Sequence, residues 1–188
     1  MTRLHIAVRD GRKAIIPTKL PVVFSAGPVR NAPLWQNDAM RIAVKRDKPI
    51  FFACPLRDGE DGFAPDLEPY LASFAGENDF PRQRAMERYY LNQAGEEGCI
   101  FFYLAKSLPR EQWKWPEKSY AQFTMKELGD WTTIKRFIPR TRLVIGVEEG
   151  FPELSTILFD IEEDLGKDFP IYHTLEQTVD AAIAMALS

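Results

Sequence analysis

The sequence contains few cysteines and histidines, and their scarcity argues against several kinds of protein. Two cysteines, Cys54 and Cys99, and two histidines, His5 and His173, occur among 188 residues. Two cysteines do not make a disulfide framework. Because both lie in or beside apolar runs, we expect buried free thiols in the reducing cytoplasm. The histidines lie in separate strand-like segments without the spacing of metal ligands, so we expect no metal site.

Long apolar runs and an excess of positive charge are also missing. No apolar run approaches the roughly 20 residues that a membrane-spanning helix needs. The segment from Met1 to His5 begins no apolar core of a signal peptide, so we expect no such leader. The formal net charge is -3, so no basic field attracts nucleic acid or anionic lipid. We therefore expect a cytoplasmic protein that binds neither nucleic acid nor membranes.

Apolar strand-like runs alternate with helical segments along the chain. This alternation predicts one α/β domain over residues 1–188, with a flavodoxin-like open parallel sheet of about five strands and helices on both faces. We find no Gly-x-Gly-x-x-Gly pattern, and we expect no redox cofactor. The expected strands cover 22–24, 49–54, 99–105, 142–147 and 170–173, and the expected helices cover 33–45, 81–94, 124–137, 151–165 and 174–187.

Two further segments stand outside this alternation. Residues 4–8 and 14–16 flank Asp10-Gly11, a strong turn signal, and so predict a β-hairpin that extends the domain at residues 1–18. Residues 55–79 are rich in glycine and proline and predict a long irregular loop, with a short helix around 67–74.

The first candidate binding segment is Ser25-Ala26-Gly27-Pro28, which ends the strand that begins at Val22. In open parallel sheets, ligands bind beyond the carboxyl ends of the strands. Gly27 would let backbone N–H groups approach an anionic or hydroxyl-rich ligand, with the N-terminus of the next helix behind them and Asn31 as its N-cap. A tight turn that binds nothing would account for the same residues.

The second candidate segment runs from Thr124 to Trp131 and includes Glu127 and Asp130. Thr-x-x-Glu is typical of a capping box, in which Thr124 caps the helix and Glu127 reaches back to the cap. The functional alternative is that Glu127 points into the crevice as an ionised carboxylate. Such a group can attack an anomeric carbon, or stabilise the transition state of N-glycosidic cleavage. Asp130 would orient the substrate or lie on the helix surface.

Several aromatic residues lie close to these segments in the expected fold. Trp35 is either a core residue or a lid over a nucleobase, and Tyr103 is either a buried aromatic or a hydrogen-bonding partner of a ligand. Trp113 and Trp115 lie on a loop, where exposed aromatics suggest a lid or an oligomer contact.

Together these segments resemble the nucleoside 2-deoxyribosyltransferase family, and the divergent bacterial and phage branch of that family most closely. The resemblance spans about residues 21–150 and rests on the order of its motifs. The motifs are Ala26-Gly27-Pro28 with Trp35-Gln36, Gly98 to Tyr103, Glu127-Leu128-Gly129, and Val147 to Pro152.

The resemblance implies a flavodoxin-like domain in which Glu127 is the nucleophile. The implied activity transfers a 2-deoxyribosyl group between nucleobases, or hydrolyses the N-glycosidic bond of a nucleoside or nucleotide. It also implies a homodimer or larger homo-oligomer. Relatives carry a further acid upstream of the glutamate, but that position falls near Ala121 here, and Glu117 is the nearest acid. This departure favours a second hypothesis, a non-catalytic module that binds a nucleotide or nucleotide sugar. A third hypothesis is a partner-binding protein that uses the tryptophan loop.

Overall fold

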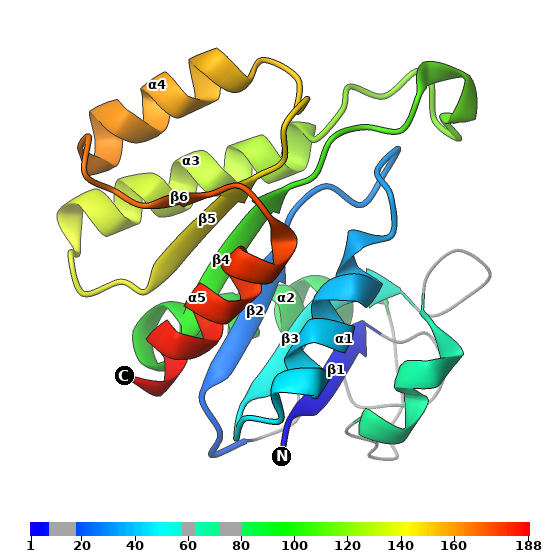
Figure 1. Ribbon diagram of the computed structural model, residues 1–188, viewed down its shortest axis with the longest axis vertical. Helices are drawn as coiled ribbons and strands as arrows, with labels where there is room; N and C mark the ends of the chain where they lie inside the picture. The colour runs from blue at the N-terminus through cyan, green and yellow to red at the C-terminus, as the bar shows by residue number, and fades with distance from the viewer. Residues whose placement is uncertain (8–17, 58–62, 72–79) are drawn as a thin grey trace.

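A six-stranded parallel sheet forms the centre of the molecule in the computed structural model (Figure 1). The structure describes residues 1–7, 18–57, 63–71 and 80–188. Every neighbouring pair of strands runs parallel, and the strand order is β1-β3-β2-β4-β5-β6. The strands are β1 (Arg3–Ala7), β2 (Val22–Ala26), β3 (Phe51–Arg57), β4 (Cys99–Leu104), β5 (Leu143–Val147) and β6 (Ile171–Tyr172).

The strand order confirms the flavodoxin-like prediction. Without β1, the order β3-β2-β4-β5-β6 is the 2-1-3-4-5 arrangement of doubly wound sheets. From β2 the chain moves outward to β3 on one side, and it then returns to place β4 on the other side of β2. The point at which the direction reverses lies between β2 and β4, and it marks the crevice where ligands of such folds bind.

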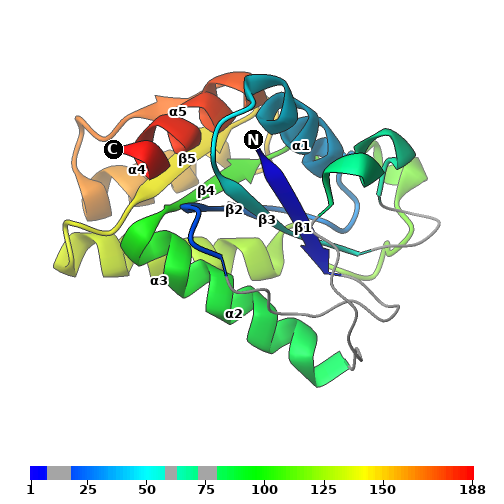
Figure 2. The ribbon, with the colours of Figure 1, turned by 90° about the horizontal axis from the view of Figure 1, so that it is seen from below.

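Helices cover both faces of the sheet, as the alternation of segments predicts. Figure 2 shows α1 and α5 on one face, with α2 and α3 on the other. Helix α4 packs on the α2 and α3 face through Ile157 and Ile161. None of the helices in the described ranges is long and apolar enough to cross a membrane. The helices are α1 (Trp35–Arg46), α2 (Phe80–Glu97), α3 (Gln122–Phe137), α4 (Leu154–Leu165) and α5 (Leu175–Leu187), with short 3-10 turns at Pro65–Tyr70 and Arg110–Gln112.

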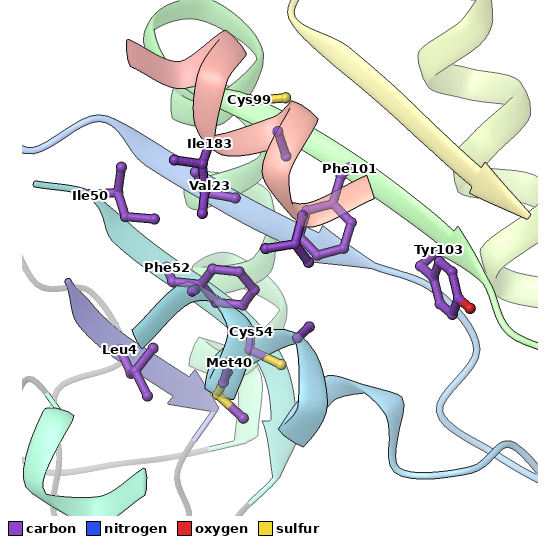
Figure 3. Packing of buried hydrophobic residues seen from close by; sticks show 14 of the residues in the cluster. Leu4, Val23, Met40, Ile50, Phe52, Cys54, Cys99, Phe101, Tyr103 and Ile183 are labelled. Carbon is purple, nitrogen blue, oxygen red and sulfur yellow. The ribbon is translucent and has the colours of Figure 1, made fainter. Parts of the chain in front are cut away.

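Strand β4 shows why the strands of this sheet are continuous apolar runs in the sequence. All of its residues are buried, because neighbouring strands lie on both sides and helices on both faces. Cys99, Phe101 and Tyr103 pack toward α1 and α5, whereas the alternate residues Ile100 and Phe102 pack toward α2, α3 and α4. Figure 3 shows the first set with its neighbours from β1, β2 and β3.

The N-terminal segment differs in part from the expected hairpin. Its first arm is present as β1, but β1 pairs parallel with β3 and forms the edge of the main sheet. The expected second arm at residues 14–16 lies outside the described residues. The sheet therefore has six strands rather than about five, because a strand that precedes β2 adds to the outer side of β3.

Both cysteines are free and buried, which confirms the expectation from their apolar surroundings. Burial raises the pKa of the Cys99 thiol well above its ordinary value. This thiol lies within 3.7 Å of the Met185 sulfur, so it packs as a small apolar side chain between β4 and α5.

We predict that Gly146→Ala destabilises the protein and that Gly129→Ala does not. A Cβ atom at Gly146 would overlap the Thr178 side chain on α5, whereas one at Gly129 would meet nothing within 4 Å. Overpacking at Gly146 should lower the free energy of unfolding by about 1–3 kcal/mol. Alanine in the middle of α3 should raise it by roughly 0.5–1 kcal/mol. Urea unfolding followed by circular dichroism measures both changes, and equal effects of the two substitutions would contradict the packing of α5 on β5.

Candidate functional site at the switch point

The candidate site begins where β2 and β4 end side by side. Ala26, the last residue of β2, pairs with Phe102 of β4, so the segments that follow the two strands leave the sheet together. The segment after β2 contains Gly27 and Pro28, which the sequence singles out. Strand β5 pairs with β4 on its other side and is followed by Glu148.

Gly27 allows the loop after β2 to pack directly against β4 and α1. A Cβ atom at this position would overlap the backbone oxygen of Tyr103 and would lie 2.5 Å from the indole ring of Trp35. A backbone oxygen inside a parallel sheet cannot move aside, so only glycine fits here. The close approach that the sequence suggests for a ligand is thus made by the protein's own backbone and indole ring.

Trp35 forms a fixed wall of the site rather than a mobile lid. Its side chain is buried, and its indole N–H donates to the Pro28 carbonyl oxygen at 2.8 Å. The Gln36 amide donates to the same oxygen at 3.3 Å. The Trp35 ring lies 5.5 Å from the Tyr103 ring, measured between centroids, so both aromatics are held on the α1 and α5 face. This placement favours the core interpretation of Trp35.

Ser25 and Ala26 are buried within the sheet. The Ser25 hydroxyl donates to the Ala53 carbonyl oxygen of β3 at 3.4 Å, and the Ala26 methyl group packs toward α2 and α3. Their side chains therefore support the strand end, and the part of this segment that extends beyond the strand is Gly27 and Pro28.

Asn31 joins the loop after β2 to the loop after β4. Its side-chain amide donates to the Trp115 carbonyl oxygen at 3.0 Å and accepts from the Trp115 N–H at 3.2 Å, and its own carbonyl accepts from Leu108 at 2.8 Å. Asn31 has φ 57, a left-handed conformation that asparagine tolerates better than most residues. It is not the expected N-cap, because α1 begins at Trp35 after Leu34.

The loop after β4 is ordered by its own aromatic residues. The Trp113 indole N–H donates to the Leu108 carbonyl oxygen at 2.8 Å, and the Trp113 ring lies 6.1 Å from that of Tyr120. Arg110 stacks 4.6 Å from the centre of the Trp113 ring. Trp113 thus packs within the loop, whereas Trp115 is 36% exposed and remains available for a lid or a contact with another molecule.

The structure places Glu127 differently from the capping box that Thr-x-x-Glu suggests. Helix α3 begins at Gln122, and its N-cap is Ala121 in a left-handed conformation with φ 55. Thr124 is therefore inside the helix, where it is buried, and Glu127 lies half-buried in the second turn. The capping-box prediction is wrong, because the loop reaches its left-handed turn three residues earlier than the motif implies.

Asp130 lies on the exposed surface of α3. Its carboxylate pairs with Lys126 at 2.9 Å, one helical turn earlier. An exposed pair of this kind contributes little to stability. Of the two positions expected for Asp130, orienting a substrate or lying on the helix surface, the structure shows the second.

The packed rings of Trp35 and Tyr103 form what we call the Trp35–Tyr103 wall. Glu127 and this wall belong to opposite faces of the sheet. Helix α3 packs on one face through Leu128, while Trp35 and Tyr103 pack on the other. A ligand can touch both groups only above the carboxyl edge, where Tyr120 packs against both cores and donates to the Ala105 carbonyl oxygen.

Glu148 enters the sequence-based prediction only within the Val147 to Pro152 motif, without a role of its own, whereas the structure places it at this edge. The Lys106 N–H donates to one carboxylate oxygen at 3.1 Å, and the Lys106 ammonium lies 3.3 Å from the other. Glu148 also contributes to raising the pKa values of both Tyr103 and Tyr120, after the larger effect of burial. Its position directly after a parallel strand was the available signal, since such positions line ligand crevices.

We predict that Asn31 holds the two loops together. Asn31→Gly keeps the left-handed backbone accessible but removes both side-chain hydrogen bonds, and should cost about 1–3 kcal/mol of unfolding free energy. Asn31→Ala should cost about 1 kcal/mol more, because alanine is strained in that conformation. Trypsin should then cleave faster at Lys106, Arg110, Lys114 or Lys118 in the second loop, with urea unfolding giving the stabilities. Unchanged cleavage in both variants would show that Asn31 does not restrain this loop.

The chain was compared with models of known protein families and with the curated proteins. No model of a known protein family matches the chain, and a search of the curated proteins found none that matches. The resemblance to the nucleoside 2-deoxyribosyltransferases thus rests on the residues named above, and it stays a prediction.

Proposed function

We propose that this protein binds a nucleoside or nucleotide at the carboxyl edge of its sheet and cleaves the N-glycosidic bond. The observation that carries the proposal is the placement of the Gly27-Pro28 loop at the switch point of a flavodoxin-like sheet. This is where such sheets bind nucleotide-like ligands. The resemblance of the same loop and of Glu127-Leu128-Gly129 to a deoxyribosyltransferase supports it.

In this proposal Glu127 is the nucleophile. An ionised Glu127 carboxylate oxygen forms a bond to the anomeric carbon of the sugar, while the bond from that carbon to the base nitrogen breaks. The base leaves with the electron pair and takes a proton from water or from an acid at the edge. Water then releases the sugar by hydrolysis, or a second nucleobase accepts it by transfer.

Binding without turnover is the second candidate function, and one observation favours it. Glu127 and the Trp35–Tyr103 wall lie on opposite faces of the sheet, so attack requires the sugar to bridge the edge. A nucleotide-binding module that lacks turnover needs no such bridge. Ala121, where relatives carry an acid, agrees with that function.

Assembly and location follow from the same proposal. We propose a homodimer or larger homo-oligomer in the cytoplasm, with the small-molecule ligand bound in each subunit. Trp115 is exposed on the loop that borders the site, and it is the residue that we expect to become covered on assembly.

We predict that Glu127→Gln abolishes release of free base. The amide keeps the size of the side chain and one acceptor oxygen but cannot form the glycosyl bond, so turnover should fall about 10³-fold or more. The measurement is chromatography of free base after incubation with a panel of nucleosides and nucleoside 5′-monophosphates. Differential scanning of thermal unfolding with the same ligands measures binding separately.

The matched control is Glu163→Gln, which changes an exposed carboxylate on α4 and should leave base release unchanged. Ligand-dependent thermal stabilisation of the unsubstituted protein, with no base released from any substrate, would establish the binding module in place of the enzyme. Base release by Glu127→Gln at the unsubstituted rate would remove Glu127 from the mechanism.

A further inference from the structure

The Tyr103 hydroxyl is an unused hydrogen-bonding group at the carboxyl edge of β4. The ring is held between Trp35 and the core, and the residue is only 5% exposed. Figure 3 shows its hydroxyl directed away from the other labelled core side chains. Within the described part of the chain, this hydroxyl has no hydrogen-bond partner, and the only buried side-chain polar atom without one is the Gln93 amide oxygen. The Tyr103 hydroxyl must therefore reach solvent.

Glu148 acts electrostatically on this hydroxyl, since its charge contributes to raising the pKa of Tyr103. Residues 103 and 104 of β4 pair with residues 146 and 147 of β5, so Glu148 follows directly beside the end of β4. Its N–H donates to the Leu104 carbonyl oxygen at 3.0 Å, which fixes the backbone, and Lys106 fixes the side chain. The Glu148 side chain is 27% exposed, so part of it reaches solvent. A carboxylate offers about four acceptor positions, and Lys106 occupies two of them.

The two tyrosines near Glu148 differ in what their hydroxyl groups do. The Tyr120 hydroxyl donates to the Ala105 carbonyl oxygen, so its proton is engaged. The Tyr103 hydroxyl remains open, and burial together with the nearby Glu148 raises its pKa to about 12. The Tyr103 phenol therefore stays neutral at physiological pH and can both donate and accept. It makes no hydrogen bond to the Glu148 carboxylate.

We propose that Tyr103 and Glu148 form a subsite for one sugar hydroxyl of the bound nucleoside. The ligand hydroxyl donates its proton to the Glu148 carboxylate and accepts from the Tyr103 phenol. A phosphate cannot replace it there, because a phosphate dianion has no proton to donate and is repelled by the carboxylate. This inference rests on the proposed function, and it specifies the part of the substrate that the α1 and α5 face recognises.

The test is calorimetric binding in the Glu127→Gln background, where the ligand is not consumed. The probes are 2′-deoxyadenosine, its 3′-deoxy and 5′-deoxy analogues, and adenine, with the corresponding thymidine series. Tyr103→Phe should weaken 2′-deoxynucleoside binding about 3- to 10-fold, and Glu148→Gln about 10-fold or more, because hydrogen bonds to charged groups are stronger. Adenine and thymine should bind the variants with unchanged affinity, because neither base carries the hydroxyl.

One analogue should identify the hydroxyl. The analogue that lacks it should bind Tyr103→Phe and the parent protein equally, whereas the other analogue should still lose affinity. The matched controls are Tyr89→Phe, a half-buried tyrosine on α2, and Glu149→Gln, the exposed neighbour of Glu148. A purely structural role of Tyr103 would weaken binding of the free bases as much as that of the nucleosides, and would overturn the proposal.

The outcomes separate this inference from the proposed function. Nucleoside affinity that depends on Tyr103 and Glu148, without base release by the unsubstituted protein, supports the subsite and removes the cleavage. Base release together with unchanged nucleoside affinity in Tyr103→Phe removes the subsite and leaves the cleavage. If none of the probes binds the parent protein, both are overturned.

Discussion

The site depends on the contact between the loop after β2 and the end of β4. At Gly27 the chain passes so close to the Tyr103 backbone oxygen and the Trp35 ring that no side chain fits. This contact fixes where the loop leaves the sheet, and through Pro28 it fixes the indole of Trp35 as well. The Asn31 side chain then holds the second loop against the first through its two hydrogen bonds to the Trp115 backbone. Both loops are thus held in place at the carboxyl edge, which would limit the ordering cost of binding a ligand there.

The candidate functional groups at the carboxyl edge come from both faces of one sheet. Tyr103 packs on the α1 and α5 side, Glu127 lies on α3 on the other side, and Glu148 follows β5 at the carboxyl edge. The ligand of the proposed function would lie across the carboxyl edge and present different groups to the two sides. A nucleoside does this, since its sugar and base extend in different directions from one bond. A flat ligand lying along one face would contact only half of these residues.

The sequence predicts the parallel sheet, because buried parallel strands are continuous apolar runs and β4 is the clearest of them. It also predicts the loop at Gly27, since the rule for ligand positions depends only on strand ends. Helix starts were less predictable. Asn31 and Thr124 look like caps, but Asn31 bonds to Trp115 in the second loop and Thr124 is buried inside α3. Glu148 received no role of its own, because a carboxylate after a strand resembles any solvated residue until its partner Lys106 is known. Likewise, a turn signal at Asp10-Gly11 suggests a hairpin and gives no indication that β1 joins β3.

The direction of the strands has a practical consequence for handling the protein. Strand β1 starts at the amino edge of the sheet, and α5 runs back to that edge, so both ends of the chain lie on that side, at separate places (Figure 1). An affinity tag, a fluorescent fusion or a surface tether at either end would therefore project from the side opposite the crevice. Immobilised protein should keep its ligand-facing loops exposed whichever end is attached.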